Sequence, residues 1–325
     1  MAAVLEPAAA GHPLRLAVHA MATRFELVLA GGDPVRLRAI GEETLAEIEA
    51  CEAALSPFRP GSQIARVNRE AYERPVPVDP DTFALLVACA RVHRASGGAF
   101  DPSVGPLLVA LGFRGAGTGD AAACAAAHAA VGWDGIDLDP GWGTVRFLRP
   151  GMALDLGAIG KGHALDLAGA VLRRHGVAAA LLHAGTSSVL ALGAPPDRDA
   201  WRVTLGRAPM APRIRLRDAA LGVSAPRGRV VHGIHGVDLH HLLDPERGTS
   251  AANGVVCAAV TCPSARDADA WSTALAVRGR ALALPAAAAG VVALRTDSGA
   301  VRWHALGDPA PWLEIPSMST SPAAP

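Results

Sequence analysis

The first part of the chain combines a short apolar run with a longer segment of helical periodicity. Residues 25–30 are mostly apolar, which predicts a strand, and Asp33-Pro34 then provide a helix N-cap followed by an N1 proline. Apolar side chains recur at helical spacing from Leu37 to Leu55. This spacing predicts a long amphipathic helix that starts at residue 34 and ends near residue 55.

Caps and glycines mark further elements along the chain. A second helix is expected to begin at Asp79-Pro80 and to end at Gly97-Gly98. The apolar pattern also predicts strands over residues 152–154 and 177–182 and helices over residues 161–175 and 266–278. This mixture, without a long polar linker, predicts an α+β (mixed α/β) fold, a compact two-lobed sandwich whose sheet order the pattern does not fix.

The two ends of the chain differ from the rest. Residues 1–13 are expected to be flexible and residues 314–325, rich in Ser, Pro and Ala, to be disordered, which leaves one domain over residues 14–313. The N-terminus lacks a basic region and a continuous apolar run, and no stretch of about 20 apolar residues occurs that could span a bilayer. A cytoplasmic protein without a membrane span is expected, or an exported form if the true start codon lies elsewhere.

Composition excludes several classes of function. Lys+Arg and Asp+Glu each number 30 of the 325 residues, and no run of like charge stands out, which argues against nucleic-acid binding. A single Tyr and six Phe leave little surface on which single-stranded bases could stack. The five cysteines lack CxxC spacing, which is typical of buried thiols in a reducing compartment.

A glycine-rich segment, DLGAIGKG, covers residues 155–162 and precedes a predicted helix. Glycines at such a turn let backbone N–H groups approach an anion, the helix N-terminus attracts negative charge, and Lys161 adds a positive charge. Taken alone, the segment is compatible with phosphate binding, but a tight turn that needs glycine only for its φ angles is the simpler interpretation. Its spacing is not that of a nucleotide P-loop.

A second candidate site lies on the predicted helix over residues 266–278. Asp269 and Thr273 are four residues apart and therefore share one face of a helix. A carboxylate and a hydroxyl side by side are hard oxygen ligands of the kind that Mg²⁺ prefers. The alternative is an acidic first turn that only complements the helix dipole.

Two further segments carry chemistry only in combination with these. Asp101-Pro102 follows Ala99-Phe100 in GAFDPSVGPL, and this pair could simply start a turn. The segment HHLLDPERG, residues 240–248, contains a histidine pair without the spacing of a zinc helix site.

Taken together and in order, these segments resemble the family of FAD:protein FMN transferases, the ApbE family, over most of the chain. GAFDPSVGPL is similar to the family's GAFDPTVGPL, DLGAIGKGHALD to DLGGIAKGYAVD, HHLLDPERG to HHIIDPRTG, and ADAWSTA to ADALSTA. MATRF resembles the family's Met-Gly-Thr segment, and SPFRPGSQIARVN resembles its aromatic-containing Ser-to-Asn segment. The resemblance implies flavin or FAD contacts from Met21, Phe58, Ala99, Phe100, Asp101, Asp155, Lys161, Leu243 and Ser272, and magnesium ligands from Asp269, Thr273 and the main-chain oxygen of Ala158.

The same resemblance implies a reaction. The FMN half of FAD passes to a threonine hydroxyl of an acceptor protein and AMP is released, with Lys161 holding phosphate oxygens and His241 as the candidate base. Two other functions stay open at this point: a magnesium-dependent pyrophosphatase that splits FAD into FMN and AMP with water, and a non-catalytic FAD-binding protein. FAD and Mg²⁺ are thus the expected substrate and cofactor, the acceptor protein is unidentified, and the oligomeric state is undetermined.

The chain departs from the family pattern at two turns. In residues 183–188, Thr186 replaces the second glycine of a Gly-Gly turn, which would cost on the order of 1–3 kcal/mol if the position requires positive φ. Ala225-Pro226 stand where the family shows a Ser-Gly-Asp type of turn, and Pro226 lacks a backbone donor. Both departures put the transfer step in doubt more than cofactor binding.

Overall fold

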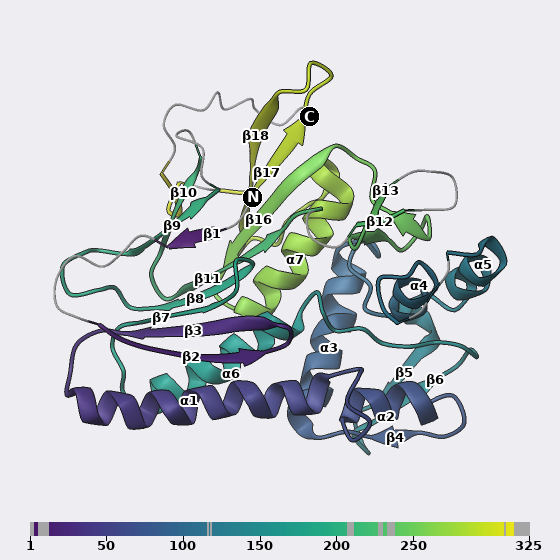
Figure 1. Cartoon of the computed structure of the whole chain (residues 1–325), viewed down its shortest axis with the longest axis horizontal. Helices are drawn as coiled ribbons and strands as arrows, with labels where there is room; N and C mark the ends of the chain where they lie inside the picture. Colours follow the sequence, from purple (N-terminus) through teal and green to yellow (C-terminus); the bar gives the residue numbers. More distant parts are fainter. Residues whose placement is uncertain are drawn as a thin grey trace. The chain divides into compact units, whose positions relative to one another are not determined.

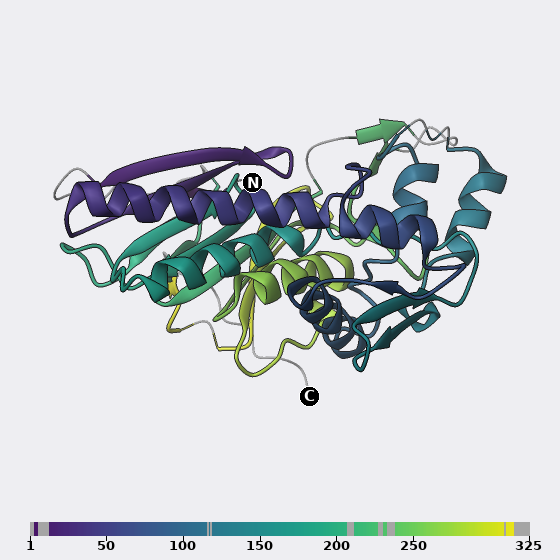
Figure 2. The ribbon, with the colours of Figure 1, turned by 90° about the horizontal axis from the view of Figure 1, so that it is seen from below.

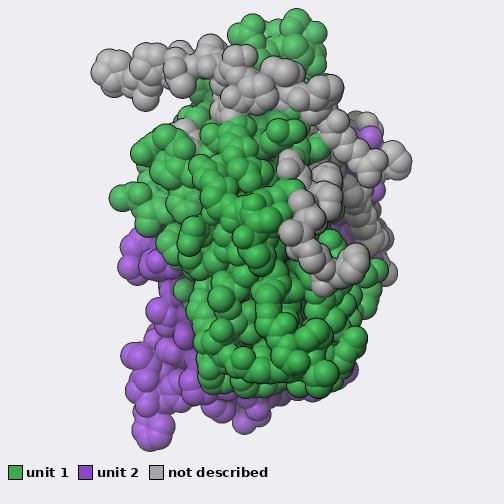
Figure 3. All heavy atoms as spheres, turned by 90° about the vertical axis from the view of Figure 1, so that its left-hand side faces the viewer, with its two compact units in different colours: residues 1–49, 161–225, 254–325 green, residues 50–160, 226–253 purple. Residues whose placement is uncertain are grey.

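A computed structural model describes residues 3–5, 13–115, 117, 119–206, 211–226, 230–232, 238–308 and 310–314. The chain forms two compact units (Figure 3): unit 1 contains residues 1–49, 161–225 and 254–325, and unit 2 contains residues 50–160 and 226–253. Flexible ends are predicted over residues 1–13 and 314–325. Most of these residues lie outside the described ones, so the predicted domain limits stay a prediction.

Unit 1 is built on an eight-stranded antiparallel sheet (Figure 1). Its order is β18-β17-β16-β11-β8-β7-β3-β2, so strands that are distant in sequence are neighbours in space. The strands are β2 (Leu14–Ala20), β3 (Thr23–Leu29), β7 (Ala180–Ala184), β8 (Ser188–Leu192), β11 (Ala219–Ser224), β16 (Val255–Cys262), β17 (Ala289–Arg295) and β18 (Val301–Leu306).

One face of this sheet is covered by helices (Figure 2), namely α1 (Pro34–Leu55), α6 (Gly160–Arg174) and α7 (Ala265–Arg278). Gly41 of α1 lies against the side chains of Leu16 and Leu29, where an added Cβ would come within 2.3 Å of Leu16. At Gly222 of β11 an added Cβ would lie 2.2 Å from the main-chain oxygen of Ala268 in α7. Helix α7 therefore rests directly on the backbone of β11.

The opposite face of the sheet is covered by a second sheet of order β1-β9-β10-β19. Because side chains alternate between faces along a strand, Val189 and Leu221 point away from the helices and into this second layer. The indole N–H of Trp201 donates to the main-chain oxygen of Leu192 at 3.2 Å and ties the two sheets together. The strands of the second sheet are β1 (Ala3–Leu5), β9 (Trp201–Leu205), β10 (Arg213–Leu216) and β19 (Leu313–Glu314).

Unit 2 combines short helices with three small sheets. Its core contains Leu107, Leu108, Leu111, Phe113 and Leu243. The helices of this unit are α2 (Gln63–Glu70), α3 (Pro80–Ala95), α4 (Gly105–Ala110), α5 (Ala121–Ala129) and η1 (Trp133–Gly135). The sheets have the orders β4-β6-β5, β12-β13 and β14-β15. Their strands are β4 (Val76–Pro77), β5 (Ile136–Asp139), β6 (Thr144–Phe147), β12 (Val230–His232), β13 (Asp238–His240), β14 (Leu243–Asp244) and β15 (Thr249–Ser250). The remaining short helix, η2 (Gly279–Ala281), follows α7 and belongs to unit 1.

The predicted α+β fold is confirmed, and so are its four long helices. Asp79 caps α3 by accepting a hydrogen bond from the Thr82 N–H, as its position before Pro80 predicts. The strand predicted over residues 177–182 begins three residues later, because the Val177 N–H closes α6 on the Leu172 oxygen at 3.0 Å. In the part of the chain that the structure describes, no helix combines the length and apolarity needed to cross a bilayer.

The strand predicted over residues 152–154 is wrong. This segment makes a single parallel bridge between Val104 and Ala153. The main-chain N–H and oxygen of Leu154 both bond the side-chain amide of Asn68, at 2.7 and 2.9 Å. A side chain thus takes the backbone groups that a neighbouring strand would need.

Candidate functional site

Helix α7, which carries both side-chain metal ligands of the prediction, has its N-terminus fixed by a residue of α6. The carboxylate of Asp166 accepts hydrogen bonds from the Ser264 hydroxyl at 2.7 Å, the Ala265 N–H at 2.8 Å and the Arg266 N–H at 3.0 Å. These N–H groups have no partner within a helix, and the negative charge complements the helix dipole. Asp166 therefore sets the position of the first turn of α7 relative to α6.

Asp269, in the second turn of α7, is a buried carboxylate with 5% of its surface exposed. The Gly162 N–H of α6 donates to its Oδ2 at 2.7 Å, and the Ser188 hydroxyl also bonds it. Burial raises the pKa of Asp269 from 3.8 to about 6, although the charge of Lys161 and these hydrogen bonds act in the opposite direction. The predicted residues Lys161 and Asp269 are therefore brought together within unit 1.

Close contact between α6 and α7 is what brings these groups together. An added Cβ at Gly162 would lie 2.0 Å from the main-chain oxygen of Ala265. Only a glycine permits this approach, and the approach in turn places the Gly162 N–H on Asp269. The second glycine of the GKG sequence is thus required by helix packing, a role that its resemblance to an anion-binding turn did not reveal.

Ser272 and Thr273 follow Asp269 on α7. Ser272 is buried, and its hydroxyl donates to the main-chain oxygen of Asp269 at 2.9 Å, whereas Thr273 is partly exposed. The Ser224 hydroxyl, at the end of β11, lies 2.8 Å from the Ser272 hydroxyl and 3.2 Å from that of Thr273. Sequence reasoning missed Ser224, because the contact joins residues that are far apart in the chain.

The donor set on α7 fits magnesium better than zinc. Among the described residues, no group of three or more His, Cys, Asp or Glu side chains is placed to hold a metal ion. Structural and catalytic zinc sites use several such ligands, whereas Mg²⁺ is bound through one or two carboxylates together with waters and substrate phosphates. One buried carboxylate and one partly exposed hydroxyl, Asp269 and Thr273, match the second pattern. Ala158, the predicted third ligand, belongs to unit 2 and stays a prediction.

In unit 2, the glycine-rich turn is organised by Asp155. Its Oδ1 accepts the Gly157 N–H at 2.8 Å, and its Oδ2 accepts the Arg114 Nε–H at 3.1 Å. The Arg114 guanidinium also lies 5.5 Å from the centre of the Phe58 ring. Phe58 is 64% exposed, which leaves an aromatic surface available for stacking. Arg114 thus links two predicted flavin contacts, and no motif in the sequence indicates this role.

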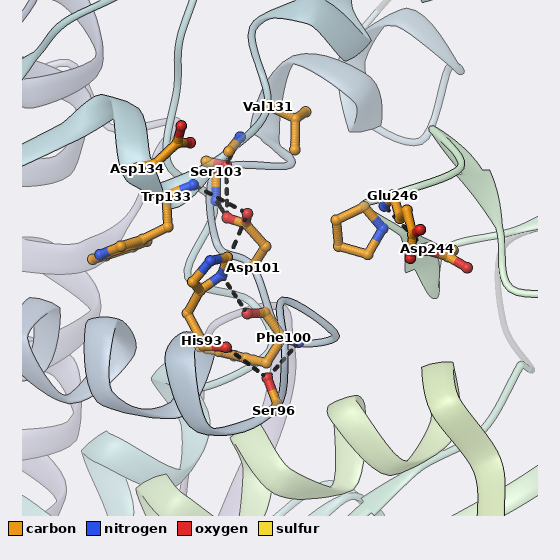
Figure 4. Close-up of polar contacts among 12 residues, drawn as sticks. His93, Ser96, Phe100, Asp101, Ser103, Val131, Trp133, Asp134, Asp244 and Glu246 are labelled. Carbon is orange, nitrogen blue, oxygen red and sulfur yellow. Dashed lines mark hydrogen bonds and ion pairs between the residues drawn. The ribbon is translucent and has the colours of Figure 1, made fainter. Parts of the chain in front are cut away.

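The predicted contacts Ala99, Phe100 and Asp101 lie in the loop after α3, and Figure 4 shows the last two. The Oδ1 of Asp101 accepts the Ser103 N–H at 2.8 Å and the Ser103 hydroxyl at 2.6 Å, and its Oδ2 accepts the Trp133 N–H at 3.2 Å. Asp101 therefore holds its own loop against η1. Ala99 and Phe100 are each 1% exposed.

His93 of α3 completes this arrangement, and sequence reasoning missed it. Its ring Nδ1–H donates to the Phe100 main-chain oxygen at 3.1 Å and lies 3.5 Å from the Asp101 carboxylate. The Asp101 carboxylate is thus engaged in contacts within unit 2. Their contribution to flavin binding stays a prediction.

The histidine-containing segment forms β13, a short loop and the β14–β15 hairpin. His241, the candidate base, is exposed, whereas the side chain of Leu243 is buried in the core of unit 2. His240 donates a ring N–H to the Ala251 oxygen at 3.0 Å, and burial lowers its pKa. His128 of α5 donates a ring N–H to the Pro245 oxygen at 2.9 Å and so supports the hairpin from outside. Of the two adjacent histidines, His241 is thus the one that solvent and a substrate can reach.

Met21, the predicted flavin contact of unit 1, lies in the turn between β2 and β3. Met21 and Ala22 both have positive φ, 49° and 57°, which is the conformation of a type I′ hairpin turn. Ala22 occupies the position of the glycine in the family's Met-Gly-Thr segment, so its Cβ adds strain at this turn.

The strain expected at Thr186 is absent. Thr186 is exposed and is not among the described residues with positive φ, whereas Gly185 has a φ of 57°. The left-handed position of this turn is therefore the one that glycine still occupies. Ala225 and Pro226 lead into residues 227–229, which lie outside the described residues.

Comparisons with known proteins find similar sequences and structures over most of the chain. The model of the ApbE family matches residues 21–294. The FAD:protein FMN transferase of Treponema pallidum is 32% identical over 289 residues, which cover 79% of this chain and 78% of that protein. The FAD:protein FMN transferase of Klebsiella pneumoniae is 27% identical over 272 residues, which cover 80% and 77%. The solved structure of the ApbE protein of Thermotoga maritima superposes with a TM-score of 0.79 at 26% identity, covering 90% of this chain and 96% of that one. The matched range contains every predicted site residue, from Met21 to Thr273.

Proposed function

The chain belongs to the ApbE family, and we propose that it transfers the FMN half of FAD to a threonine hydroxyl of an acceptor protein, releasing AMP. The observation that carries this proposal is the arrangement on α7. A buried carboxylate and a hydroxyl, Asp269 and Thr273, lie one helical turn apart, and the charge of Lys161 acts on the carboxylate. A merely structural acidic turn would have no need to bury its carboxylate.

The residues divide the chemistry between them. Asp269 and Thr273 would hold a magnesium ion, with the Ala158 main-chain oxygen as the third ligand implied by the resemblance. When bound, such an ion neutralises pyrophosphate oxygens and polarises the phosphorus that is attacked. Lys161 stabilises the charge that develops on the same oxygens. FAD binding itself draws on Met21, Phe58 and the other predicted flavin contacts.

The transfer requires one bond to form and one to break. The acceptor threonine oxygen attacks the phosphorus of the FMN half, the bond from that phosphorus to the bridging oxygen breaks, and AMP leaves with that oxygen. The threonine proton passes to a base, for which exposed His241 is the candidate, since imidazole is the side chain that most often acts as a general base.

The decisive experiment measures AMP and protein-bound flavin in the same reaction. The purified chain is incubated with FAD, Mg²⁺ and a candidate acceptor protein, once with its threonine intact and once with that threonine replaced by valine. We expect AMP and in-gel flavin fluorescence in equal amounts, both dependent on the threonine. Asp269→Asn should abolish both, whereas the matched control Asp267→Asn, on the same helix, should retain them.

Two other outcomes would contradict the proposal. AMP release at the same rate without any acceptor would identify a pyrophosphatase. FAD binding without AMP release, unchanged by Asp269→Asn, would identify a flavin carrier.

A further inference from the structure

Three hydroxyl groups meet where the end of β11 touches α7. The Ser224 hydroxyl lies 2.8 Å from the Ser272 hydroxyl and 3.2 Å from the Thr273 hydroxyl, and the Ser272 hydroxyl lies 2.9 Å from the Asp269 main-chain oxygen. Each hydroxyl has one proton to donate and two lone pairs with which to accept. The direction of each hydrogen bond can therefore be worked out by counting protons.

The assignment of protons starts from the Asp269 main-chain oxygen. A carbonyl oxygen can only accept, so Ser272 gives its one proton to the Asp269 oxygen. The contact between Ser224 and Ser272 must then use the Ser224 proton. With that proton committed, the contact between Ser224 and Thr273 must use the proton of Thr273.

This order of donation has a consequence for Thr273. A threonine inside a helix commonly turns its hydroxyl proton to the main-chain oxygen four residues earlier, which here is that of Asp269. Here the proton count assigns that proton to Ser224 instead, so the two lone pairs of the Thr273 oxygen lie on the side that faces away from Ser224. An oxygen in that orientation can coordinate a cation through its lone pairs, because its proton points to the other side.

We infer that Ser224 is a positioning residue for the metal site: it accepts the Thr273 proton and so presents the Thr273 oxygen lone pairs to a divalent cation. This inference rests on the proposed function, because it deepens the role given there to Thr273.

Ser224 is itself held firmly enough to do this. It is the last residue of β11 and pairs with Ala258 of β16, and the preceding Val223 N–H donates to the Ser187 oxygen at 2.6 Å. Two residues earlier, Gly222 lies so close to α7 that an added Cβ would lie 2.2 Å from the Ala268 oxygen. The strand and the helix are thus in backbone contact, which fixes the position of Ser224 beside Thr273.

The test compares Ser224→Ala with Ser224→Thr, which keeps the hydroxyl. The matched control is Thr261→Val on the neighbouring strand β16, because the Thr261 hydroxyl is also buried and donates to a main-chain oxygen, that of Ala289, at 3.2 Å. Each full-length variant is titrated with Mg²⁺ in the presence of ADP, whose diphosphate stands for that of FAD. The readout is the rise of the thermal unfolding midpoint with Mg²⁺ concentration, since a bound cation stabilises the native state by mass action.

We expect Ser224→Ala to raise the half-saturating Mg²⁺ concentration about fivefold, the effect of losing one hydrogen bond, and Ser224→Thr to restore it. Thr261→Val should lower the midpoint in the absence of Mg²⁺ without changing the half-saturating concentration.

Two results would overturn the inference, and they differ from each other. Equal half-saturation in Ser224→Ala and wild type would show that the hydroxyl serves packing alone, while the proposed function stands. A wild-type chain that shows no response to Mg²⁺ would overturn both the inference and the metal assignment.

Discussion

Replacing Asp269 by asparagine should abolish activity. In the metal-free protein, the same substitution should also remove a loss of folding stability that occurs as the pH rises. Burial raises the pKa of this carboxyl from 3.8 to about 6, a difference of about two units that corresponds to about 3 kcal/mol at 1.36 kcal/mol per unit. The native state therefore binds the proton more tightly than the unfolded chain. The resulting stabilisation is fully present below pH 3.8 and is lost as the pH rises through about 6.

The measurement is urea unfolding in EDTA at pH 5.0 and pH 7.5. Over this interval the Asp269 carboxyl alone should lower the free energy of unfolding by about 1 kcal/mol. Other groups also titrate, so the quantity that matters is the difference between wild type and Asp269→Asn. The asparagine cannot ionise, and the variant should become more stable relative to wild type as the pH rises. Asp267→Asn, on the same helix, should keep the wild-type pH dependence.

Mg²⁺ adds a second arm to this experiment. At pH 7.5 the Asp269 carboxylate is ionised and buried, and a bound cation would add its positive charge to that of Lys161. Mg²⁺ with ADP should therefore stabilise the wild type and leave Asp269→Asn unchanged. Parallel pH dependence of the two proteins in EDTA would refute the assignment of a raised pKa to this carboxyl, whatever the activity data show.

Three further substitutions test separate parts of the structure. Ala22→Gly removes a Cβ from a residue at φ 57° and should raise the free energy of unfolding by about 1 kcal/mol, measured by thermal or urea unfolding. Gly162→Ala would place a Cβ 2.0 Å from the Ala265 oxygen, so it should destabilise unit 1 and abolish AMP release, whereas Gly61→Ala, with no atom within 4 Å, should do neither. Arg114→Ala should weaken FAD binding, followed by flavin fluorescence, because it removes the group that links Phe58 to the glycine-rich turn; unchanged affinity would show that Arg114 has no part in the site.

Features that depend on neighbouring residues could be predicted from the sequence. Asp33 and Asp79 each accept a hydrogen bond from the backbone N–H three residues later, and each precedes a proline. Both helices begin where this local pattern predicts. Asp269 and Thr273 share a face of α7 because four residues make about one turn of helix. Local spacing is thus sufficient to find the two candidate ligands.

Features that depend on distant residues could not be predicted. Residues 152–154 have the apolar pattern of a strand, but the side chain of Asn68, 86 residues earlier, takes the backbone groups of Leu154. Arg114 reaches Asp155 across 41 residues, and no pattern near either residue indicates the pairing. Such contacts follow from the tertiary fold, and a single sequence carries no periodic signal for them.

Ser224 shows why this distinction matters for function. It stands 49 residues before Thr273, and in sequence it is one more serine at the end of an apolar strand. The backbone contact of β11 with α7 at Gly222 makes it a neighbour of the candidate metal ligand. Local sequence therefore supplies the Thr273 oxygen, but the direction in which that oxygen presents its lone pairs is decided by a strand from another part of the chain.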